Sequence, residues 1–278
     1  MKPCISQVTT LSTPFEAALD AIARGGWRAV ELWLTQLETF LAEGRTTSEV
    51  RAMLVDRGLS AAAASSQGGL LLSAGIERET HWDLFRRRLE LLQALEVPVL
   101  VVTADFARDP SPDDYGRASS SLAEASELAR SFGVRIALEF QKNAHFCASL
   151  DTTLALIAQC GSENVGVCLD LFHYYTGPSK FEDLAYLSRE NLAWVQICDL
   201  SGVPRELAGD ADRIFPGEGD FQIPPILEHL RRIGYDGYVS LELLNPQLWR
   251  IPADRVADLG YQAMLRVLAP EDQPSSRA

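Results

Sequence analysis

Apolar and β-branched residues occur in eight short bursts along the chain, and amphipathic stretches separate the bursts. The bursts cover residues 4–8, 29–34, 59–65, 99–103, 134–140, 165–171, 193–199 and 238–244. Apolar positions recur with a helical period over 15–24, 48–57, 77–95, 113–132, 150–159, 181–189, 223–233 and 252–268. This pattern predicts strands and helices in strict alternation.

The strand segments are almost continuously apolar, as in the Val-Leu-Val-Val run at 99–102. Such runs are typical of parallel strands that helices cover on the outside. Eight strand–helix units in 278 residues fit a closed (β/α)8 TIM barrel, whose usual size is about 250 residues. We therefore expect a single α/β domain over 1–269 and a flexible tail at 270–278, with an open doubly wound sheet as the alternative.

Charge and composition limit the classes of function that the chain can have. The chain has 25 Lys and Arg against 38 Asp and Glu, a net charge of −13, which disfavours binding to nucleic acid or to anionic membranes. We find no apolar run of about 20 residues and no signal peptide at the start, so we expect a cytoplasmic protein. The five cysteines are scattered without a C-x-x-C pair, which favours reduced, buried thiols.

Polar residues end the last four predicted strands. These residues are Glu139, Asp170, Gln196 and Glu242. In a barrel they would meet at the mouth formed by the carboxyl ends of the strands. Three buried carboxylates and an amide oxygen would repel one another unless a cation lay among them, so the pattern predicts that these four residues bind one divalent metal ion. Oxygen ligands favour Mn²⁺ or Mg²⁺, and Co²⁺ or Zn²⁺ stay open.

A single acid at a strand end is more often a helix cap or an ion-pair partner. Four polar ends on successive strands are less easily explained in that way, and we prefer the metal site.

Further residues are expected at the same mouth. His173 follows Asp170 by three positions and is our candidate catalytic histidine, as a hydrogen-bond donor or proton shuttle. Arg213 lies in the long connection 199–221 and is expected to bind substrate, with an ion pair to a nearby acid as the alternative. We also assign substrate contacts to Glu31, Trp33, His145 and Trp249, where the alternatives are a solvated loop for the histidine and core packing for the aromatic residues.

Four segments carry a resemblance to a known family. They are Ile-Ala-Leu-Glu-Phe at 136–140, Leu-Asp-Leu-Phe-His at 169–173, Asp-Arg-Ile-Phe-Pro-Gly-Glu-Gly at 212–219 and Val-Ser-Leu-Glu-Leu at 239–243. With these segments the chain resembles, to about residue 268, the xylose isomerase-like barrels of sugar isomerases and epimerases, and among them the inosose isomerases.

The resemblance implies a metal site and also shows a departure from the family. The family binds metal through Glu, Asp, His and Glu, which carries over to Glu139, Asp170 and Glu242. Gln196 stands where many relatives have histidine, and in this it is similar to 3-dehydroshikimate dehydratases of the same superfamily.

The shared chemistry of the family is proton abstraction beside a ketone, with a metal stabilising the ene-diolate. We expect Glu139 and Glu242 to be catalytic, removing and returning the proton while they bind the metal. The predicted function is therefore a metal-dependent isomerase or epimerase of a small keto-polyol, an inosose or a ketose. A dehydratase acting on 3-dehydroshikimate is the alternative.

Two other functional classes compete with this prediction. Endonuclease IV-type AP endonucleases resemble this barrel but use three metals and several histidines, whereas this chain has 4 histidines and a charge of −13. A non-catalytic barrel that binds metal or sugar is the third hypothesis. Relatives are often dimers or tetramers, which leaves a homo-oligomer open.

Overall fold

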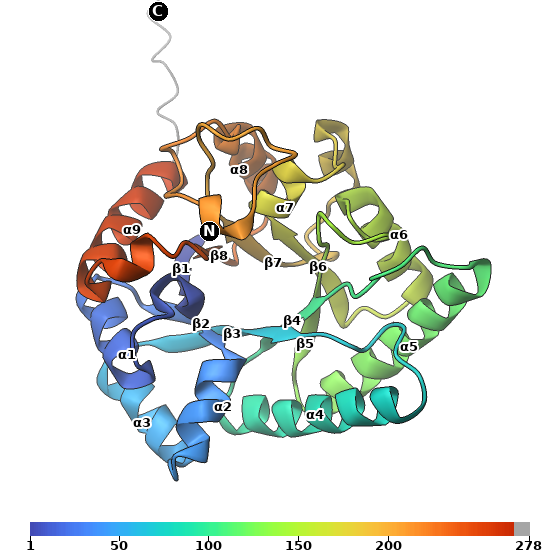
Figure 1. Cartoon of the computed structure of the whole chain (residues 1–278), viewed down its shortest axis with the longest axis horizontal. Coiled ribbons are helices and arrows are strands. Elements are labelled where there is room, and N and C mark those ends of the chain that lie inside the picture. The colour runs from blue at the N-terminus through green and yellow to red at the C-terminus, as the bar shows by residue number, and fades with distance from the viewer. Residues whose placement is uncertain (270–278) are drawn as a thin grey trace, which may run out of the picture.

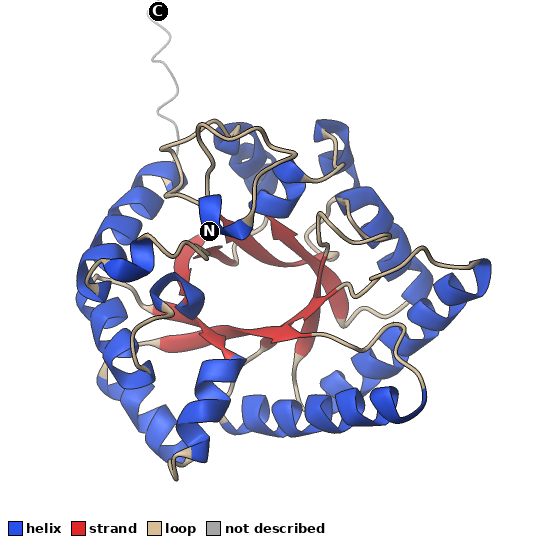
Figure 2. Ribbon diagram, in the orientation of Figure 1, coloured by secondary structure: helices blue, strands red, loops and turns tan. Residues whose placement is uncertain are grey.

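Eight parallel strands close into a barrel in which each strand pairs with the next and β8 pairs with β1 (Figures 1 and 2). The computed structural model describes residues 1–269. The strands are β1 Lys2–Ser6, β2 Ala29–Trp33, β3 Ser60–Gln67, β4 Val99–Thr103, β5 Arg135–Glu139, β6 Val165–Asp170, β7 Leu192–Ile197 and β8 Tyr238–Leu241. The predicted TIM barrel is confirmed, and the expected tail at 270–278 lies outside the described residues.

The helices form a ring outside the strands (Figure 2). They are α1 Phe15–Arg24, α2 Leu34–Ala42, α3 Thr47–Asp56, α4 Gly75–Ala94, α5 Pro112–Ser131, α6 Leu150–Cys160, α7 Leu171–Thr176, α8 Ile223–Arg232 and α9 Ala253–Leu268. Short 3-10 turns cover Gln7–Thr10, Phe181–Tyr186, Asp210–Asp212 and Leu248–Arg250.

Two helical segments differ from the sequence prediction. The helix expected over 181–189 is a 3-10 turn, Phe181–Tyr186, because the helix after β6 begins at once as α7. The carboxylate of Asp170 caps α7 by accepting a hydrogen bond from the backbone N–H of Phe172 at 2.8 Å. The helix α2, which begins directly after β2, was not predicted.

The side chain of one tryptophan is buried among small residues of the barrel strands. Trp194 of β7 is 2% exposed and belongs to a buried cluster formed mainly by small residues: Cys4, Ala29, Ala62, Ala63, Val101, Ala137, Cys168 and Ala193. Small side chains on the facing strands leave the room that the indole needs at the density of a protein core. The indole Nε1 donates a hydrogen bond to Glu31 of β2, at 3.0 Å, which joins β7 to β2 across the barrel.

The long connection between β7 and α8 is fixed by one buried carboxylate. Asp199 accepts hydrogen bonds from the backbone N–H groups of Leu200, Gly217 and Phe221, each at 2.9 Å. The loop approaches so closely that a Cβ on Gly219 would lie 2.4 Å from an oxygen of Asp199. This anchoring holds the connection, and with it Arg213, over the barrel mouth.

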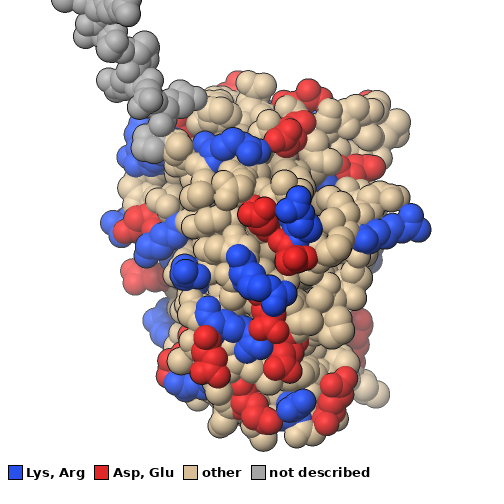
Figure 3. Space-filling view, turned by 90° about the vertical axis from the view of Figure 1, so that its left-hand side faces the viewer, with Lys and Arg blue, Asp and Glu red and all other residues tan. Residues whose placement is uncertain are grey.

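The surface carries charges of both signs. On the side formed by α1, α3 and α9, acidic and basic side chains are interspersed (Figure 3), so the net charge of −13 does not produce an all-acidic face there. Across residues 1–269, none of the helices combines the length and the apolar character needed to cross a bilayer.

Candidate active site

Three of the four predicted strand-end residues, Glu139, Gln196 and Glu242, line a cavity of about 140 Å³. The fourth, Asp170, is fully buried beside two lining residues, His173 and Arg213. The cavity lining comprises Trp33, Ser65, Ser66, Thr103, Glu139, Gln141, His173, Gln196, Asp210, Arg213, Glu242 and Leu244. Glu139 is the last residue of β5 and Glu242 directly follows β8. A larger hollow of about 660 Å³ near the N-terminal ends of α4 and α5 contains none of these strand-end groups among its described lining, so the chemistry points to the smaller cavity.

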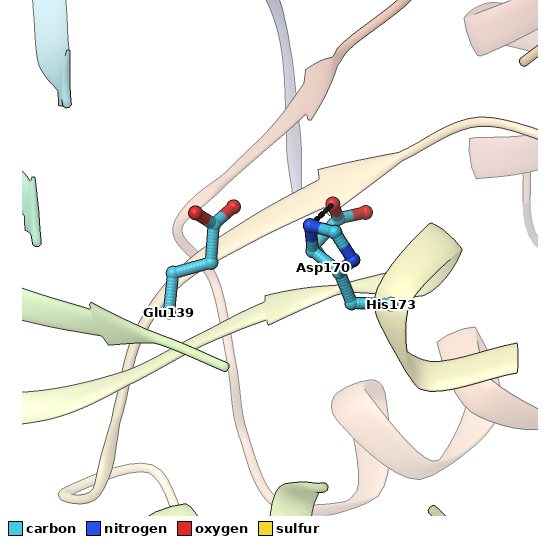
Figure 4. A group of neighbouring side chains, drawn as sticks. All are labelled: Glu139, Asp170 and His173. Atoms are coloured by element: carbon cyan, nitrogen blue, oxygen red, sulfur yellow. Dashed lines mark ion pairs between the residues drawn. The ribbon is translucent and has the colours of Figure 1, made fainter. Parts of the chain in front are cut away.

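Glu139, Asp170 and His173 form a cluster with the dimensions of a metal site. One potential ligand atom from each of the three residues lies within 4.8 Å of those of the other two, and all three side chains are buried. Figure 4 shows Glu139 extending from the end of β5 toward the neighbouring pair formed by Asp170 and His173.

His173 is oriented by contacts on both ring nitrogens. Its Nδ1 accepts the backbone N–H of Lys142 at 3.4 Å, and its Nε2 lies 3.6 Å from Oδ2 of Asp170. Burial lowers the pKa of His173 to about 4, against the opposing effect of Asp170. The imidazole is therefore neutral near pH 7, with Nε2 directed into the carboxylate cluster.

Arg213 lies between two carboxylates of the site. Its Nη1 donates to Glu242 at 2.9 Å, its Nη2 lies 3.0 Å from Oδ2 of Asp170, and the guanidinium is stacked 4.3 Å from the ring centre of Phe172. Asp210 accepts from both Nη2 at 2.8 Å and Nε at 3.1 Å. Burial opposes the charge of Arg213, but the attraction of Asp170 and Glu242 outweighs it and raises its pKa.

Gln196 connects the buried carboxylates of β2 and β8. Its Nε2 donates to Glu31 at 2.9 Å and to Glu242 at 2.8 Å, while its Oε1 accepts from the thiol of Cys168 at 3.1 Å. Burial raises the pKa of Cys168 well above its usual value, which keeps the thiol protonated as a donor. The amide oxygen is therefore directed toward Cys168 and the amide nitrogen toward the carboxylates.

The electrostatics of the site favour a bound cation. Burial, followed by the proximity of Asp170, raises the pKa of Glu139 well above its usual value, and burial also raises the pKa of Glu242 despite Arg213. Oδ2 of Asp170 is buried and accepts no hydrogen bond from the described residues, although Arg213 lies beside it as an ion-pair partner. A buried carboxylate oxygen without a hydrogen-bond donor, close to further carboxylates and a neutral imidazole, fits a divalent metal ion.

Three residues expected to contact substrate lie away from the described cavity lining. Glu31 is fully buried beneath it and hydrogen-bonds to Trp194 and Gln196. His145 is half-exposed, and its Nδ1 lies 2.7 Å from Oδ1 of Asp109. The indole of Trp249 donates to the backbone oxygen of Val8 at 2.8 Å.

The structure adds residues that the sequence analysis did not select. Ser65, Ser66 and Thr103 bring hydroxyl groups from the ends of β3 and β4. Gln141 donates to Oε2 of Glu139 at 2.5 Å. Two of these hydroxyl groups were detectable, because Ser65 and Thr103 end the predicted strand segments 59–65 and 99–103, but only carboxylate and amide side chains were selected at strand ends.

The closed barrel and the polar groups at the carboxyl ends of its strands put the candidate site at the end of the barrel where TIM-barrel enzymes carry their active sites. The chain belongs to the xylose isomerase-like TIM barrel family, whose model matches residues 19–268.

Its relatives include enzymes of two reaction types. Inosose isomerase from Halalkalibacterium halodurans is 24% identical, covering 97% of this chain and 97% of the relative. 3-Dehydroshikimate dehydratase from Pseudomonas aeruginosa is 25% identical over 92% of this chain, which spans 40% of that protein. A solved structure of IolI protein with a bound zinc atom shares the fold, with a TM-score of 0.90 at 21% identity, and covers 96% of this chain and 98% of that one.

Proposed function

We propose that this protein is a divalent-metal-dependent isomerase or epimerase of a small keto-polyol, an inosose or a ketose. The observation that carries the proposal is that the buried carboxylates of Glu139 and Glu242 line a cavity of about 140 Å³ together with a neutral His173. The buried carboxylate of Asp170 lies 3.6 Å from Nε2 of this histidine. Such a set of groups serves proton transfer at a carbon beside a carbonyl. The similarity to inosose isomerase supports this choice of substrate class.

The residues that would hold the metal are Glu139, Asp170, Gln196 and Glu242. The zinc of the IolI structure supports a divalent ion of this kind without fixing which one, and Mn²⁺ or Mg²⁺ suit the oxygen ligands. Gln196 would present its oxygen only after its amide turns over, because Oε1 now faces Cys168. A bound divalent ion supplies Lewis-acid stabilisation of the negative charge that develops on the carbonyl oxygen.

The protein's own side chains handle the proton. Glu139 and Glu242, whose pKa values burial raises, remove the proton from the carbon beside the ketone and return it. His173 hydrogen-bonds to the developing oxyanion through Nε2, since its Nδ1 is occupied by the backbone of Lys142. Trp33, Ser65, Ser66 and Thr103 line the wall against which the substrate is oriented.

A dehydratase is the second candidate function, and two observations favour it. Gln196 replaces the histidine that the family resemblance implies, and a 3-dehydroshikimate dehydratase is 25% identical to this chain. The same proton abstraction followed by loss of a β-hydroxyl group would give an alkene.

Proton NMR in D₂O tests the proposal. The metal-free protein is reconstituted with Mg²⁺, which leaves the spectra sharp, and incubated with inososes, ketohexoses and 3-dehydroshikimate. We expect metal-dependent deuterium uptake beside the ketone of an inosose or ketose, with an isomer or epimer as product. Alkene formation from 3-dehydroshikimate alone would establish the dehydratase. The absence of exchange across the panel with metal bound would overturn both.

A further inference from the structure

We propose that Arg213 is a tethered cation that occupies the space between Asp170 and Glu242 before metal loading, and that Asp210 is the positioning residue that receives it when the metal enters. This inference rests on the proposed metal site. It concerns how the protein's own guanidinium group controls access to that site.

The contacts show that Arg213 is bound to the metal-site carboxylates themselves. Its Nη1 donates to Glu242 at 2.9 Å and its Nη2 lies 3.0 Å from Oδ2 of Asp170, the oxygen that accepts no hydrogen bond among the described residues. The side chain is 2% exposed, so its charge must be neutralised by these groups and not by water. A guanidinium and a divalent ion cannot both occupy this contact with Asp170 and Glu242, and they therefore compete.

Arg213 has a further charge partner, Asp210, which it can keep when its guanidinium group moves away from Asp170 and Glu242. Asp210 lies three residues earlier in the same loop and accepts from both Nε and Nη2. Its side chain is about half exposed, at 54%, so it stands at the rim, whereas Asp170 lies fully buried inside. An Arg213 that releases Asp170 and Glu242 keeps a charge partner in Asp210, which lowers the cost of making room for the metal.

Arg213 is predicted to bind substrate, yet in this structure its guanidinium group contacts the carboxylates of Asp170, Asp210 and Glu242. The exchange reconciles the two statements, because it releases part of the guanidinium group. Once Nη1 has left Glu242, it is a free donor at the cavity wall. The loop is held by Asp199 at its base, so the guanidinium moves while the backbone of Arg213 stays bound to Asn245 at 2.9 Å. Substrate binding through Arg213 would then follow metal loading.

Two substitutions with opposite expected effects test the inference by calorimetric titration of Mn²⁺ into the metal-free protein, with no activity assay. Arg213→Gln removes the competing charge, and we expect Mn²⁺ to bind at least about tenfold more tightly. Asp210→Asn removes the alternative partner, and we expect Mn²⁺ to bind about threefold more weakly, as for a half-exposed ion pair.

The controls are Arg205→Gln and Asp220→Asn, which change exposed residues of the same loop and should leave the Kd for Mn²⁺ unchanged. Weaker binding in both Arg213→Gln and Asp210→Asn would mean that the two residues only support the site, and unchanged binding in both would likewise overturn the inference. If Arg213→Gln does not fold, Asp210→Asn decides, because an unchanged or tighter Kd in that variant contradicts the exchange. If the unaltered protein binds no Mn²⁺, the proposed metal-dependent function fails, and this inference fails with it.

Discussion

The two halves of the barrel contribute different chemistry to one cavity. Strands β5–β8 supply Glu139, Asp170, Gln196 and Glu242, which are charged or strongly polar and buried. Strands β2–β4 supply an aromatic ring and hydroxyl groups, from Trp33, Ser65, Ser66 and Thr103. Under the proposed function, the β5–β8 half, here called the catalytic half, would hold a cation and move protons, and the β2–β4 half, the recognition half, would bind the polyhydroxylated substrate.

The connection between the halves lies below the cavity and not in its wall. Glu31 of β2 accepts hydrogen bonds from Trp194 and Gln196 of β7. A residue of the β2–β4 half thereby helps to orient Gln196 in the β5–β8 half. If the division is correct, substitutions in β5–β8 should change turnover or metal binding, and substitutions in β2–β4 should change substrate affinity.

The largest effect is expected from the two glutamates. Glu139→Gln and Glu242→Gln should each lower turnover by about 10²- to 10⁴-fold, because a positioned acid or base contributes that much to proton transfer. Turnover is measured by deuterium uptake beside the ketone, with metal content determined in the same samples. Glu163→Gln, an exposed glutamate, is the matched control. Full turnover in both metal-loaded variants would refute the two-carboxylate scheme.

The sequence predicts only part of the site that strands β5–β8 form. Glu139 and Asp170 could be found because a nearly continuous apolar run must end where its strand leaves the core, and a polar residue at that point reaches the mouth. The ion pair of Arg213 with Asp210 was only an alternative, because the path of the loop 199–221 depends on the hydrogen bonds of Asp199, which no periodicity reveals.

The positions of Cys168 and His145 could not be predicted from the sequence either, because they depend on tertiary contacts. Cys168 lies inside an apolar strand and therefore looks like an ordinary core residue, yet it orients Gln196. His145 follows the site strand β5 in sequence, but the direction of its loop takes it to Asp109. Local pattern predicts which strand end a residue occupies, and tertiary contacts decide where loop residues lie.

Substitutions of Gln196 and His173 should have the next largest effects, the first on metal affinity and the second on turnover. Gln196→Ala should weaken Mn²⁺ binding by about 10- to 100-fold, as loss of a ligand or its close support does. His173→Ala should lower turnover by about 10²-fold and change the Kd for Mn²⁺ little, because His173 is proposed to act on the substrate oxyanion. Calorimetry and deuterium uptake are the two measurements. A larger loss of metal affinity in His173→Ala would make His173 the nitrogen ligand, in line with its place in the cluster with Glu139 and Asp170.

A smaller effect is expected in the recognition half. Ser66→Ala and Thr103→Val each remove one hydroxyl group from the cavity wall, and each should cost about 1 kcal/mol of substrate binding, or roughly a fivefold rise in KM. The value of kcat should stay within about twofold, since neither group handles the proton. Steady-state kinetics with the substrate identified by NMR measures both constants. A fall in kcat at constant KM would place these hydroxyl groups in the chemical step and contradict the proposed division of roles between strands β2–β4 and β5–β8.

The smallest effect on metal binding should come from Cys168. Cys168→Ala removes the thiol donor to Oε1 of Gln196 and frees the amide to turn over, so the Kd for Mn²⁺ should fall by a few-fold, about the value of one hydrogen bond. Cys160→Ala changes a half-buried thiol at the end of α6 and serves as the control. A weaker affinity in Cys168→Ala would indicate that the present amide orientation is the one that supports the metal.

A final prediction concerns stability outside the site. The backbone N–H of Ser111, followed by the guanidinium of Arg108, lowers the pKa of Asp114 to about 2. Because the folded value lies below the unfolded one, the stabilisation is fully present above about pH 4 and is lost as the pH falls toward 2. The difference in Tm between the unaltered protein and Asp114→Asn should therefore be constant near neutral pH and shrink below pH 4. A constant difference down to pH 2.5 would contradict this.

The tryptophan inside the barrel gives the protein its own optical probe. Trp194 donates to Glu31, and Glu31 accepts from Gln196, so the indole is two hydrogen bonds away from the proposed ligand set. Turning the Gln196 amide changes the electric field at Glu31 and hence at the indole. The emission wavelength of Trp194 should therefore report metal loading without any added dye. The difference spectrum between the protein and its Trp194→Phe variant isolates that signal from the other four tryptophans.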